Sequence, residues 1–559
     1  MMCKLGISCL LFMCFLTSIT YGENATSSKK RKISQDVFLS FKQTDMLPTL
    51  PNDEDILEQT SELQPNIVYY LHVQFIPSWV QFIILQTHAY LHNVSLGYSM
   101  EMLSNKSVTG QNIGLAANVT SSRTAQFFLE NDNPFNVTVL IAVVAYNKNA
   151  PLPGGCNMEF EEFETAPWLR VNVSGAMVSV SSQPAQGPIT WGAMDSCNLP
   201  TLRYQSYHLF LPEKDFQVNT YFDYIRRMIT VKRILQNGRL VPDFSGEMMH
   251  KYSAYHGTGS VYATIVSTSS VSVQQHAAYV PALTYTCSPA QYTDTCQVLT
   301  STFSRSLCAL VLFIGLFVCL FGHSFFQTEL FLMSTLMGAI ITYIVVAPLG
   351  MTDSTNVVLA TVGGITIANF WLLLWWIIGS PLFSLIMATL SLGFLCASLV
   401  FYTPLGDNPY MVSNVNYWLA FICCMLVVAV VFAPYTNRVN ILACSVVGSY
   451  AAIVPVDHYI GANLKFIFIN TMRRATVSGF NQAIIDPPFQ AKDGVLVLIW
   501  VVLAVVGYVM QSQRFGDKPV FPRSPHHWGS IPPTPRRPSL VSEERPLLYG
   551  SPGANNVFS

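Results

Sequence analysis

Charged side chains are scarce in this chain of 559 residues. Asp, Glu, Lys and Arg make up 11% of it, whereas about 25% is typical of soluble proteins. The net charge is -1 and no basic stripe runs along the chain, so little would neutralise the phosphates of a nucleic acid. We therefore expect no nucleic-acid partner. The shortage of charge lies in the second half, where apolar residues dominate.

The signatures of common catalytic sites are also missing. A glycine-rich phosphate loop and a Gly-x-Ser-x-Gly motif are both absent from the sequence. The apolar block, residues 303–512, has only His323 and His458 as histidines, without the pair at helical spacing that favours a zinc site. In the first half the histidines are scattered, and we expect His88 and His92 at the surface. We predict no catalytic residue, no cofactor and no metal, and hence a protein that is not an enzyme.

The second half contains a series of long apolar runs. A helix needs about 20 mostly apolar residues to cross a membrane, because it rises about 1.5 Å per residue through a core of about 30 Å. The runs are residues 303–321, 330–347, 357–378, 382–401, 417–433, 441–456 and 495–510. The short link at Gly379 leaves open that the third and fourth are one broken block. We predict a seven-span transmembrane domain over residues 303–512, surrounded by the lipid bilayer.

The first half has the features of an exported protein. Residues 1–22 combine Lys4 with a short apolar core and small residues, which is typical of a signal peptide. Residues 23–36 are interpreted as a linker, and export would place everything up to residue 302 outside the cytoplasm. Sequons of the form Asn-x-Ser/Thr occur only in this part of the chain, which favours N-glycosylation there. The sequons begin at Asn24, Asn93, Asn105, Asn118, Asn136 and Asn172.

An even number of cysteines remains in the exported part after the signal peptide. They are Cys156, Cys197, Cys287 and Cys296. In an oxidising compartment such a set indicates disulfides, and four cysteines allow three pairings. We favour Cys156–Cys197 and Cys287–Cys296, because the second pair closes a short loop just before the first span.

The exported part is expected to be mostly β-structure. Residues 66–91, 125–146 and 260–273 are rich in β-branched and aromatic side chains, and turn-forming clusters separate them. One helix is predicted at residues 213–228. We interpret the ectodomain as two β-sandwich-like units, residues 37–190 and 191–302, although a barrel is the other β-architecture open to these strands.

The Pro-rich tail, residues 513–559, carries two short signals. Glu543 precedes Leu547 and Leu548 at the spacing of an acidic dileucine motif, which engages clathrin adaptors. The motif predicts routing to endosomes or lysosomes, and the alternative is an inert tail. Ser539 follows two arginines and a proline, as in a basophilic kinase site. Phosphate there would change the charge beside the sorting motif.

Several short segments occur in an order that resembles a known family. The segments are residues 151–160, 210–213, 279–287, 321–331, 401–406 and 488–490. Together they are similar to the transmembrane seven superfamily member three family, whose membrane block is shared with transmembrane-198-like proteins. The resemblance implies a seven-span plasma-membrane glycoprotein with a role in cell survival under stress, including unfolded-protein stress. It brings no catalytic or ligand-binding residues with it.

Ionisable groups are nearly absent from the interiors of the predicted spans. Arg305, Glu329, Asp457 and His458 lie at span ends, whereas pumps and transporters usually place such groups inside the bilayer. We therefore interpret the chain as a non-enzymatic glycoprotein whose ectodomain binds an unknown extracellular or lumenal ligand. A transporter or channel is one alternative, and an orphan seven-span receptor is another.

The predicted topology places the N-terminus outside and the protein in the plasma membrane. The signal peptide, sequons and cysteines decide this, because lysines and arginines occur on both sides of the spans and leave the charge bias ambiguous. Residues 457–494 would then lie outside. They are expected to form either an amphipathic helix on the membrane surface or a packed loop.

Overall fold

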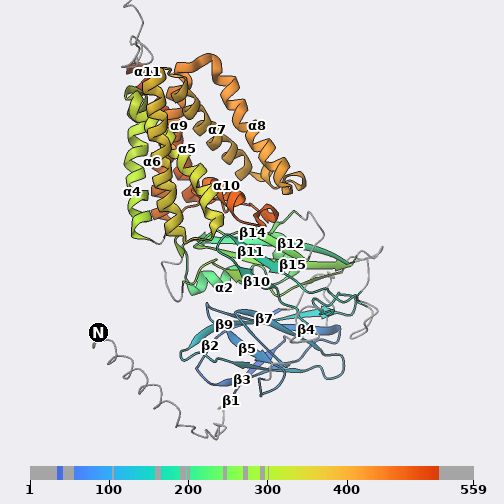
Figure 1. Cartoon of the computed structure of the whole chain (residues 1–559). Coiled ribbons are helices and arrows are strands. Elements are labelled where there is room, and N and C mark those ends of the chain that lie inside the picture. The colour runs from blue at the N-terminus through green and yellow to red at the C-terminus, as the bar shows by residue number, and fades with distance from the viewer. Residues whose placement is uncertain are drawn as a thin grey trace, which may run out of the picture.

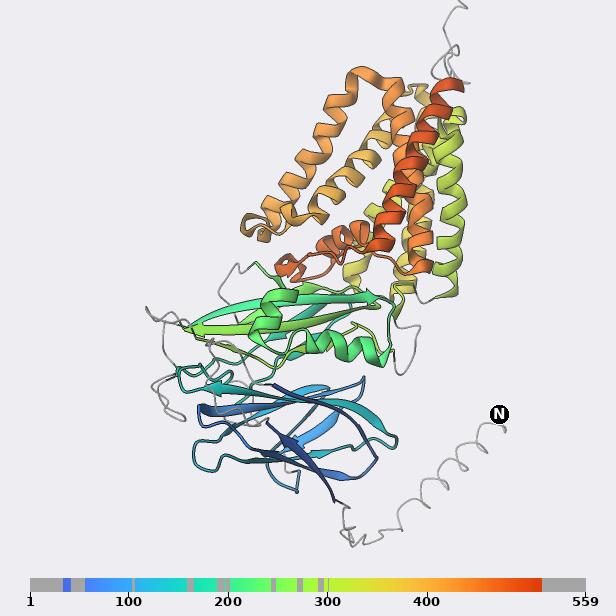
Figure 2. The same ribbon diagram turned by 180° about the vertical axis from the view of Figure 1, so that it is seen from behind.

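The computed structural model arranges two β-rich units and a helical bundle in line, with the second β unit between the first and the bundle (Figures 1 and 2). The structure describes residues 34–41, 56–102, 106–157, 165–188, 197, 202–242, 248–268, 275–289, 296–299 and 301–514. The predictions that lie outside these residues concern the signal peptide 1–22, Asn24, Asn105, Ser539, Glu543, Leu547 and Leu548.

The first unit is a sandwich of two sheets. One sheet has the order β1 (Ser34–Ser40), β3 (Val68–Gln74), β8 (Ala125–Glu130), β5 (Val94–Gly97) and β6 (Ser107–Gly110). The other has the order β2 (Ile56–Leu63), β9 (Val137–Asn147), β4 (Val80–Ala89) and β7 (Asn112–Asn118). Leu71 of β3 and Phe127 of β8 are fully buried, as expected for the inward side chains of such strands.

Strands β4 and β9 are buried along nearly their whole length rather than on alternate residues. Their second face is covered because this sheet packs against the second unit. Tyr221 of the second unit donates a hydrogen bond to the Ala89 carbonyl at 3.1 Å, and Asn112 Nδ2 donates to the Leu283 carbonyl at 3.3 Å. The two units therefore share one continuous hydrophobic core.

The second unit is also built of two sheets. One has the order β10 (Arg170–Val173), β11 (Met177–Ser181), β14 (Met249–Ser253) and β18 (Ala483–Ile484). The other has the order β13 (Arg239–Leu240), β12 (Leu202–Glu213), β15 (Thr258–Thr268) and β16 (His276–Ala278), with β17 (Ala282–Thr284) also paired to β15. The structure thus confirms a β-rich N-terminal region of two units, the predicted ectodomain, followed by seven helices that could span a membrane.

Two details of the second unit differ from the sequence-based expectation. The boundary between the two units lies before residue 190. Strand β10 pairs with β11, and β11 pairs with β14 of the second unit. The single helix predicted at residues 213–228 is replaced by α2 (Val218–Arg226) and α3 (Val231–Asn237). The chain turns between them, and the side chain of Thr230 accepts a hydrogen bond from the Arg233 N–H to cap α3.

Both favoured disulfides are present. Cys156 is bonded to Cys197, and Cys287 is bonded to Cys296 directly before the bundle. The two cysteines of the second bond are nine positions apart in the sequence, so this bond closes a short loop. It ties the last stretch of the ectodomain near the start of the first membrane helix.

Seven helices are long and apolar enough to cross a membrane. They are α4 (Thr302–Phe321), α5 (Phe326–Val346), α6 (Asp353–Ile378), α7 (Leu382–Tyr402), α8 (Asn414–Phe432), α9 (Thr436–Ile460) and α11 (Ala491–Arg514). Gly379 adopts a left-handed conformation that ends α6, so the third and fourth spans are separate. The sixth and seventh helices are longer than the apolar runs predicted, because polar residues at their ends are buried and continue the helices.

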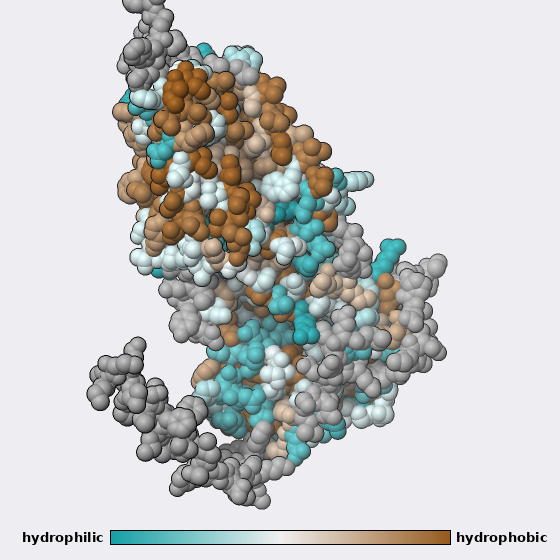
Figure 3. Space-filling view, viewed as in Figure 1, coloured by the Kyte–Doolittle hydropathy of each residue, from teal (hydrophilic) through white to brown (hydrophobic). Residues whose placement is uncertain are grey.

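Helix α9 forms the centre of the bundle and packs against α4, α7 and α11. In the most apolar stretch of α9, 72% of the residues are buried inside the protein. The corresponding share in the peripheral helix α8 is 11%. Glycines allow α4 and α9 to approach closely, as small residues commonly do between membrane helices. A Cβ atom on Gly448 of α9 would lie 2.5 Å from the backbone nitrogen of Cys319 in α4. On the face shown in Figure 3 the surface of the bundle is largely hydrophobic, and hydrophilic residues gather over the sheets.

We expect Gly448→Ala to lower the thermal stability of the purified protein. The added methyl group meets backbone atoms of α4 that have no room to give, and overpacking of this kind typically costs about 1–3 kcal/mol. Gly494→Ala in α11 is a matched control, because the nearest atom to its added Cβ, on Phe489, is 4.0 Å away. Thermal unfolding in detergent measures both variants. Equal midpoints for the two would contradict the close helix contact.

Candidate functional site

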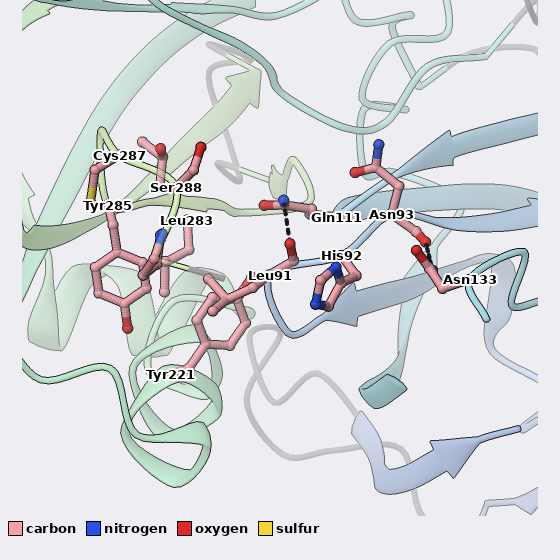
Figure 4. A pocket seen from close by; sticks show the side chains of 12 residues that line it. Leu91, His92, Asn93, Gln111, Asn133, Tyr221, Leu283, Tyr285, Cys287 and Ser288 are labelled. Carbon is pink, nitrogen blue, oxygen red and sulfur yellow. Dashed lines mark hydrogen bonds between the residues drawn. The ribbon is translucent and has the colours of Figure 1, made fainter. Parts of the chain in front are cut away.

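A small cavity lies between the two β units. Its volume is about 310 Å³, and it is lined by Leu91, His92, Asn93, Gln111, Asn133, Tyr221, Leu283, Thr284, Tyr285, Cys287, Ser288 and Pro289. Figure 4 shows Tyr285, Cys287 and Ser288 on one side and Asn93 and Asn133 on the other. Burial raises the pKa of both tyrosines and lowers the pKa of His92. At neutral pH the lining is therefore aromatic, polar and uncharged, which suits a small neutral polar ligand.

The second feature is the junction where the ectodomain meets the bundle. Strand β18 belongs to the connection between α9 and α11, yet it pairs in parallel with β14 of the second unit. Lys251 is opposite Ala483, and Tyr252 is opposite Ile484. A segment of the membrane domain thus completes a sheet of the ectodomain, in the manner of an added edge strand.

Two buried aspartates organise the connection that carries β18. Asp457, at the end of α9, accepts hydrogen bonds from the Leu464 N–H at 2.8 Å, the Lys465 N–H at 3.1 Å and the Lys465 ammonium at 3.2 Å. Asp493, in the first turn of α11, accepts from the Asn463 N–H at 2.7 Å and the Gln490 N–H at 3.0 Å. The two carboxylates satisfy backbone donors of a loop that would otherwise be buried without partners.

Glu213 brings the ectodomain into this network. Its Oε1 accepts a hydrogen bond from Asn463 Nδ2 at 2.8 Å, and its Oε2 lies 3.8 Å from the Lys492 ammonium. The pKa of Glu213 is raised to about 8, chiefly by burial and then by the nearby carboxyl of Asp493, while Lys492 and Asn463 oppose the shift. At neutral pH Glu213 is therefore mostly protonated.

The short helix α10 (Phe466–Thr476) supplies buried cations to the same junction. Arg473 donates to the Ala254 carbonyl at 2.7 Å and to Ser253 Oγ at 3.3 Å. Arg474 donates to the Met411 carbonyl at 2.6 Å and lies over the ring of Tyr417. Residues 457–494 thus contain a helix, but that helix is packed between the ectodomain and the bundle.

An ion pair at the edge of the junction adds a third contact between the two parts. His208 Nε2 lies 2.7 Å from Asp486 Oδ2, and Arg239 reaches Asp486 Oδ1 at 3.1 Å. Burial would raise the pKa of Asp486, but the hydrogen bond and charge of His208 and the charge of Arg239 hold this pKa below its usual value. Asp486 is therefore ionised and ties β12 and β13 to the connection that follows α10.

The residues predicted as sites from sequence do not converge. The described sequon residues Asn93, Asn118, Asn136 and Asn172 are all exposed, on separate strands and turns of the ectodomain. His88 is not at the surface as expected: it is fully buried beside Asn112 and Gln86, and burial lowers its pKa to about 4. Within the described ranges, no three His, Cys, Asp or Glu residues are placed to hold a metal ion.

Sequence reasoning also missed the junction itself. Glu213, Asn463 and Asp493 are separated by up to 280 positions in the chain, and nothing in their local pattern points to a shared site. The only available signal was the placement of acids and cations in and around residues 457–494, which otherwise reads as an external loop. The arrangement contains no activated nucleophile among its described residues. It can hold the ectodomain and bundle in one orientation, and it can respond to pH.

We expect the junction to be tighter in acid. Because the pKa of Glu213 is raised to about 8 in the folded protein, its stabilising contribution is present near pH 4 and is lost as the pH rises through 8. Glu213→Gln mimics the protonated form, so its thermal midpoint should fall less than that of wild type between pH 5 and pH 8. Glu62→Gln, at an exposed position, is the control. Parallel curves for wild type and Glu213→Gln would contradict the protonation of Glu213.

Comparisons with known proteins match the order of these parts. Residues 53–146 match a family model described as the TM7SF3-like, N-terminal immunoglobulin-like domain, and residues 151–290 match the TM7SF3-like, second immunoglobulin-like domain. Residues 308–512 match the TM7S3/TM198-like domain. The two β units are therefore immunoglobulin-like, and the helical bundle is of a type shared with a second group of membrane proteins.

The chain is also similar to curated proteins over most of its length. It is 30% identical to human Transmembrane 7 superfamily member 3 over 463 residues, which is 81% of each chain. The rat and mouse proteins of the same name are each 30% identical to it, over 470 and 466 residues, and 82% of each is covered. The chain belongs to the transmembrane 7 superfamily member 3 family.

Proposed function

We propose that this multi-pass membrane protein is a non-enzymatic plasma-membrane glycoprotein that binds a ligand through its immunoglobulin-like ectodomain. The observation that carries the proposal is the junction. Strand β18 and the buried Glu213–Asn463–Asp493 network hold the ectodomain directly on the bundle. A ligand that repositions the second unit would therefore act on the ends of α9 and α11.

The cavity between the two β units is the favoured ligand site. It lies where the two β units meet, and boundaries between domains are a common place for small-molecule pockets. Its uncharged aromatic and polar lining, with Tyr221 and Tyr285, suits hydrogen bonding and ring stacking to a neutral polar molecule. The exposed Asn93 at its rim is also a predicted glycosylation site.

Cell survival under unfolded-protein stress is the biological role that the family resemblance suggests. We propose it for this chain on that basis, with the N-terminus outside and the tail in the cytoplasm. The four described sequon residues are exposed, and both disulfides join ectodomain cysteines, as an oxidising compartment allows. These features support an exported ectodomain.

Glycan mapping tests the orientation on which the proposal depends. In cells, Asn93→Gln and Asn136→Gln should each lose one N-glycan, and each should run faster on a gel than wild type until a glycosidase removes the difference. Asn237→Gln, which changes an exposed asparagine outside any sequon, should run as wild type. An ectodomain tag should stain on intact cells. Absence of glycans on both asparagines would overturn the exported ectodomain and the ligand-binding role with it.

Changing the tail motif tests the proposed sorting. We expect Leu547→Ala combined with Leu548→Ala to raise surface staining of the tagged protein, because the change removes the leucine pair that a clathrin adaptor would bind. Leu540→Ala, in the same tail, is the control. Unchanged surface staining in the double variant would show that the tail does not route the protein to endosomes or lysosomes.

A further inference from the structure

A buried acidic side chain lies at the end of the bundle farthest from the ectodomain. Helix α4 leads away from the ectodomain, the short 3-10 turn η3 (Gly322–Ser324) follows it, and Glu329 lies in the first turn of α5 (Figure 1). Glu329 is 1% exposed, and neither of its carboxyl oxygens accepts a hydrogen bond from the described residues. An acceptor left in this state is costly to bury, so its protonation state must be accounted for.

The neighbours of Glu329 come from other elements. His323 of η3 places Nδ1 at 3.9 Å from Glu329 Oε2. Asn440 and Cys444, both on α9 and both fully buried, lie beside the carboxyl. The Asn440 side-chain oxygen is also without a hydrogen bond in the described part of the chain. The cluster thus contains three buried oxygen atoms that accept no hydrogen bond from the described residues: the two carboxyl oxygens of Glu329 and the side-chain oxygen of Asn440.

The ring of His323 does not supply the missing positive charge. Asn440 Nδ2 lies 3.0 Å from His323 Nδ1. Because an amide nitrogen can only donate, Nδ1 accepts this hydrogen bond and the neutral ring carries its proton on Nε2. The backbone N–H of His323 donates to Gln511 Oε1 at 3.0 Å, which fixes the position of the ring relative to α11.

No other cation balances the carboxyl in the described structure. The titratable groups that face it are His323 and Cys444. Arg514 of α11, at the same end of the bundle, lies over the ring of Phe321 at 4.7 Å. A carboxylate buried without a cation in such a place would be strongly destabilising.

We propose that Glu329 is a proton-binding site of the membrane bundle, occupied at neutral pH, and that His323 exchanges this proton. In the exchange the O–H bond of Glu329 breaks and an N–H bond forms at His323 Nδ1, which gives up its hydrogen bond from Asn440 and moves closer to the carboxyl than its present 3.9 Å. The carboxyl becomes an anion and the ring a cation, so the total charge is unchanged. The imidazolium then passes a proton to a water molecule that reaches the buried ring when the turn opens. The ring is neutral again and Glu329 is left as the anion until a proton returns by the same route.

Proton occupancy at this site bears on four elements at once. The cluster joins η3, α5, α9 and α11, and Gln511 Nε2 also donates to the carbonyls of Val318 and Cys319 at the end of α4. Loss of the proton would leave a negative charge where these elements meet. The site is independent of the proposed ligand binding by the ectodomain, so either proposal can fail without the other.

Infrared spectroscopy of the full-length protein in lipid nanodiscs tests the proposal, because a neutral carboxylic acid has a carbonyl band separate from that of a carboxylate. At neutral pH we expect Glu329→Gln to lose one such band that wild type shows. The band should shift in D₂O, which shows that the proton exchanges. His323→Gln should keep the band and slow its shift about 100-fold, as loss of a general base typically does.

Two variants serve as controls. Glu213→Gln removes another carboxyl that is expected to be neutral, so it identifies the band that belongs to Glu213 and not to Glu329. Glu62→Gln removes an exposed carboxylate and should leave the band of Glu329 unchanged. If Glu329→Gln does not fold, Glu329→Asp replaces it and should displace the band instead of abolishing it.

Three outcomes would overturn the proposal. A band unaffected by either change at Glu329 would mean that Glu329 is ionised. A band that is unchanged in D₂O, or that shifts equally fast in His323→Gln, would remove the exchange through His323. A band that NaCl abolishes and choline chloride does not would assign the site to sodium.

Discussion

One constraint shapes the centre of this molecule: most of the connection between α9 and α11 is buried between the ectodomain and the bundle. Its backbone donors need partners there, and Asp457, Asp493 and Glu213 supply or support them. Asn463 has the pivotal position, because its N–H donates to the bundle through Asp493 while its side chain donates to the ectodomain through Glu213. The pairing of β18 with β14 depends on a connection held in this way.

A polar junction of this kind differs in purpose from an apolar one. Burying charges costs free energy that their mutual attraction only partly offsets, so a buried ion network is weak evidence of added stability. It does restrict geometry, because each hydrogen bond is made in one relative orientation of the two parts. Arg473 illustrates this: burial lowers its pKa only to about 10, so it remains charged and must keep its partners Ser253 and Ala254. The junction therefore specifies how the ectodomain is oriented on the bundle.

The same physics separates what the sequence could reveal from what it could not. The spans were predictable because the bilayer imposes a length of apolar residues that is local in sequence, and the two disulfides followed from cysteine positions in a segment expected to be exported. Strand β18 has two residues and gains its identity only from β14, more than 200 positions away. His88 is buried because a second unit covers its sheet, and Glu329 was placed correctly at a span end without any sign that other helices enclose it. Each of these depends on non-local packing.

The polar groups at the two ends of the bundle are carried by the same pair of helices. Asp457 and Asn440 are both on α9, and Asp493 and Gln511 are both on α11. The two helices are held together between these ends by Trp500 of α11, which donates to the Val446 carbonyl at 3.3 Å and packs its ring 5.1 Å from that of Tyr450. Packed helices move as rigid bodies more readily than they bend. A displacement of α9 against α11 at the ectodomain junction would therefore also change the distances around His323 and Glu329, although no side chain connects the two clusters directly.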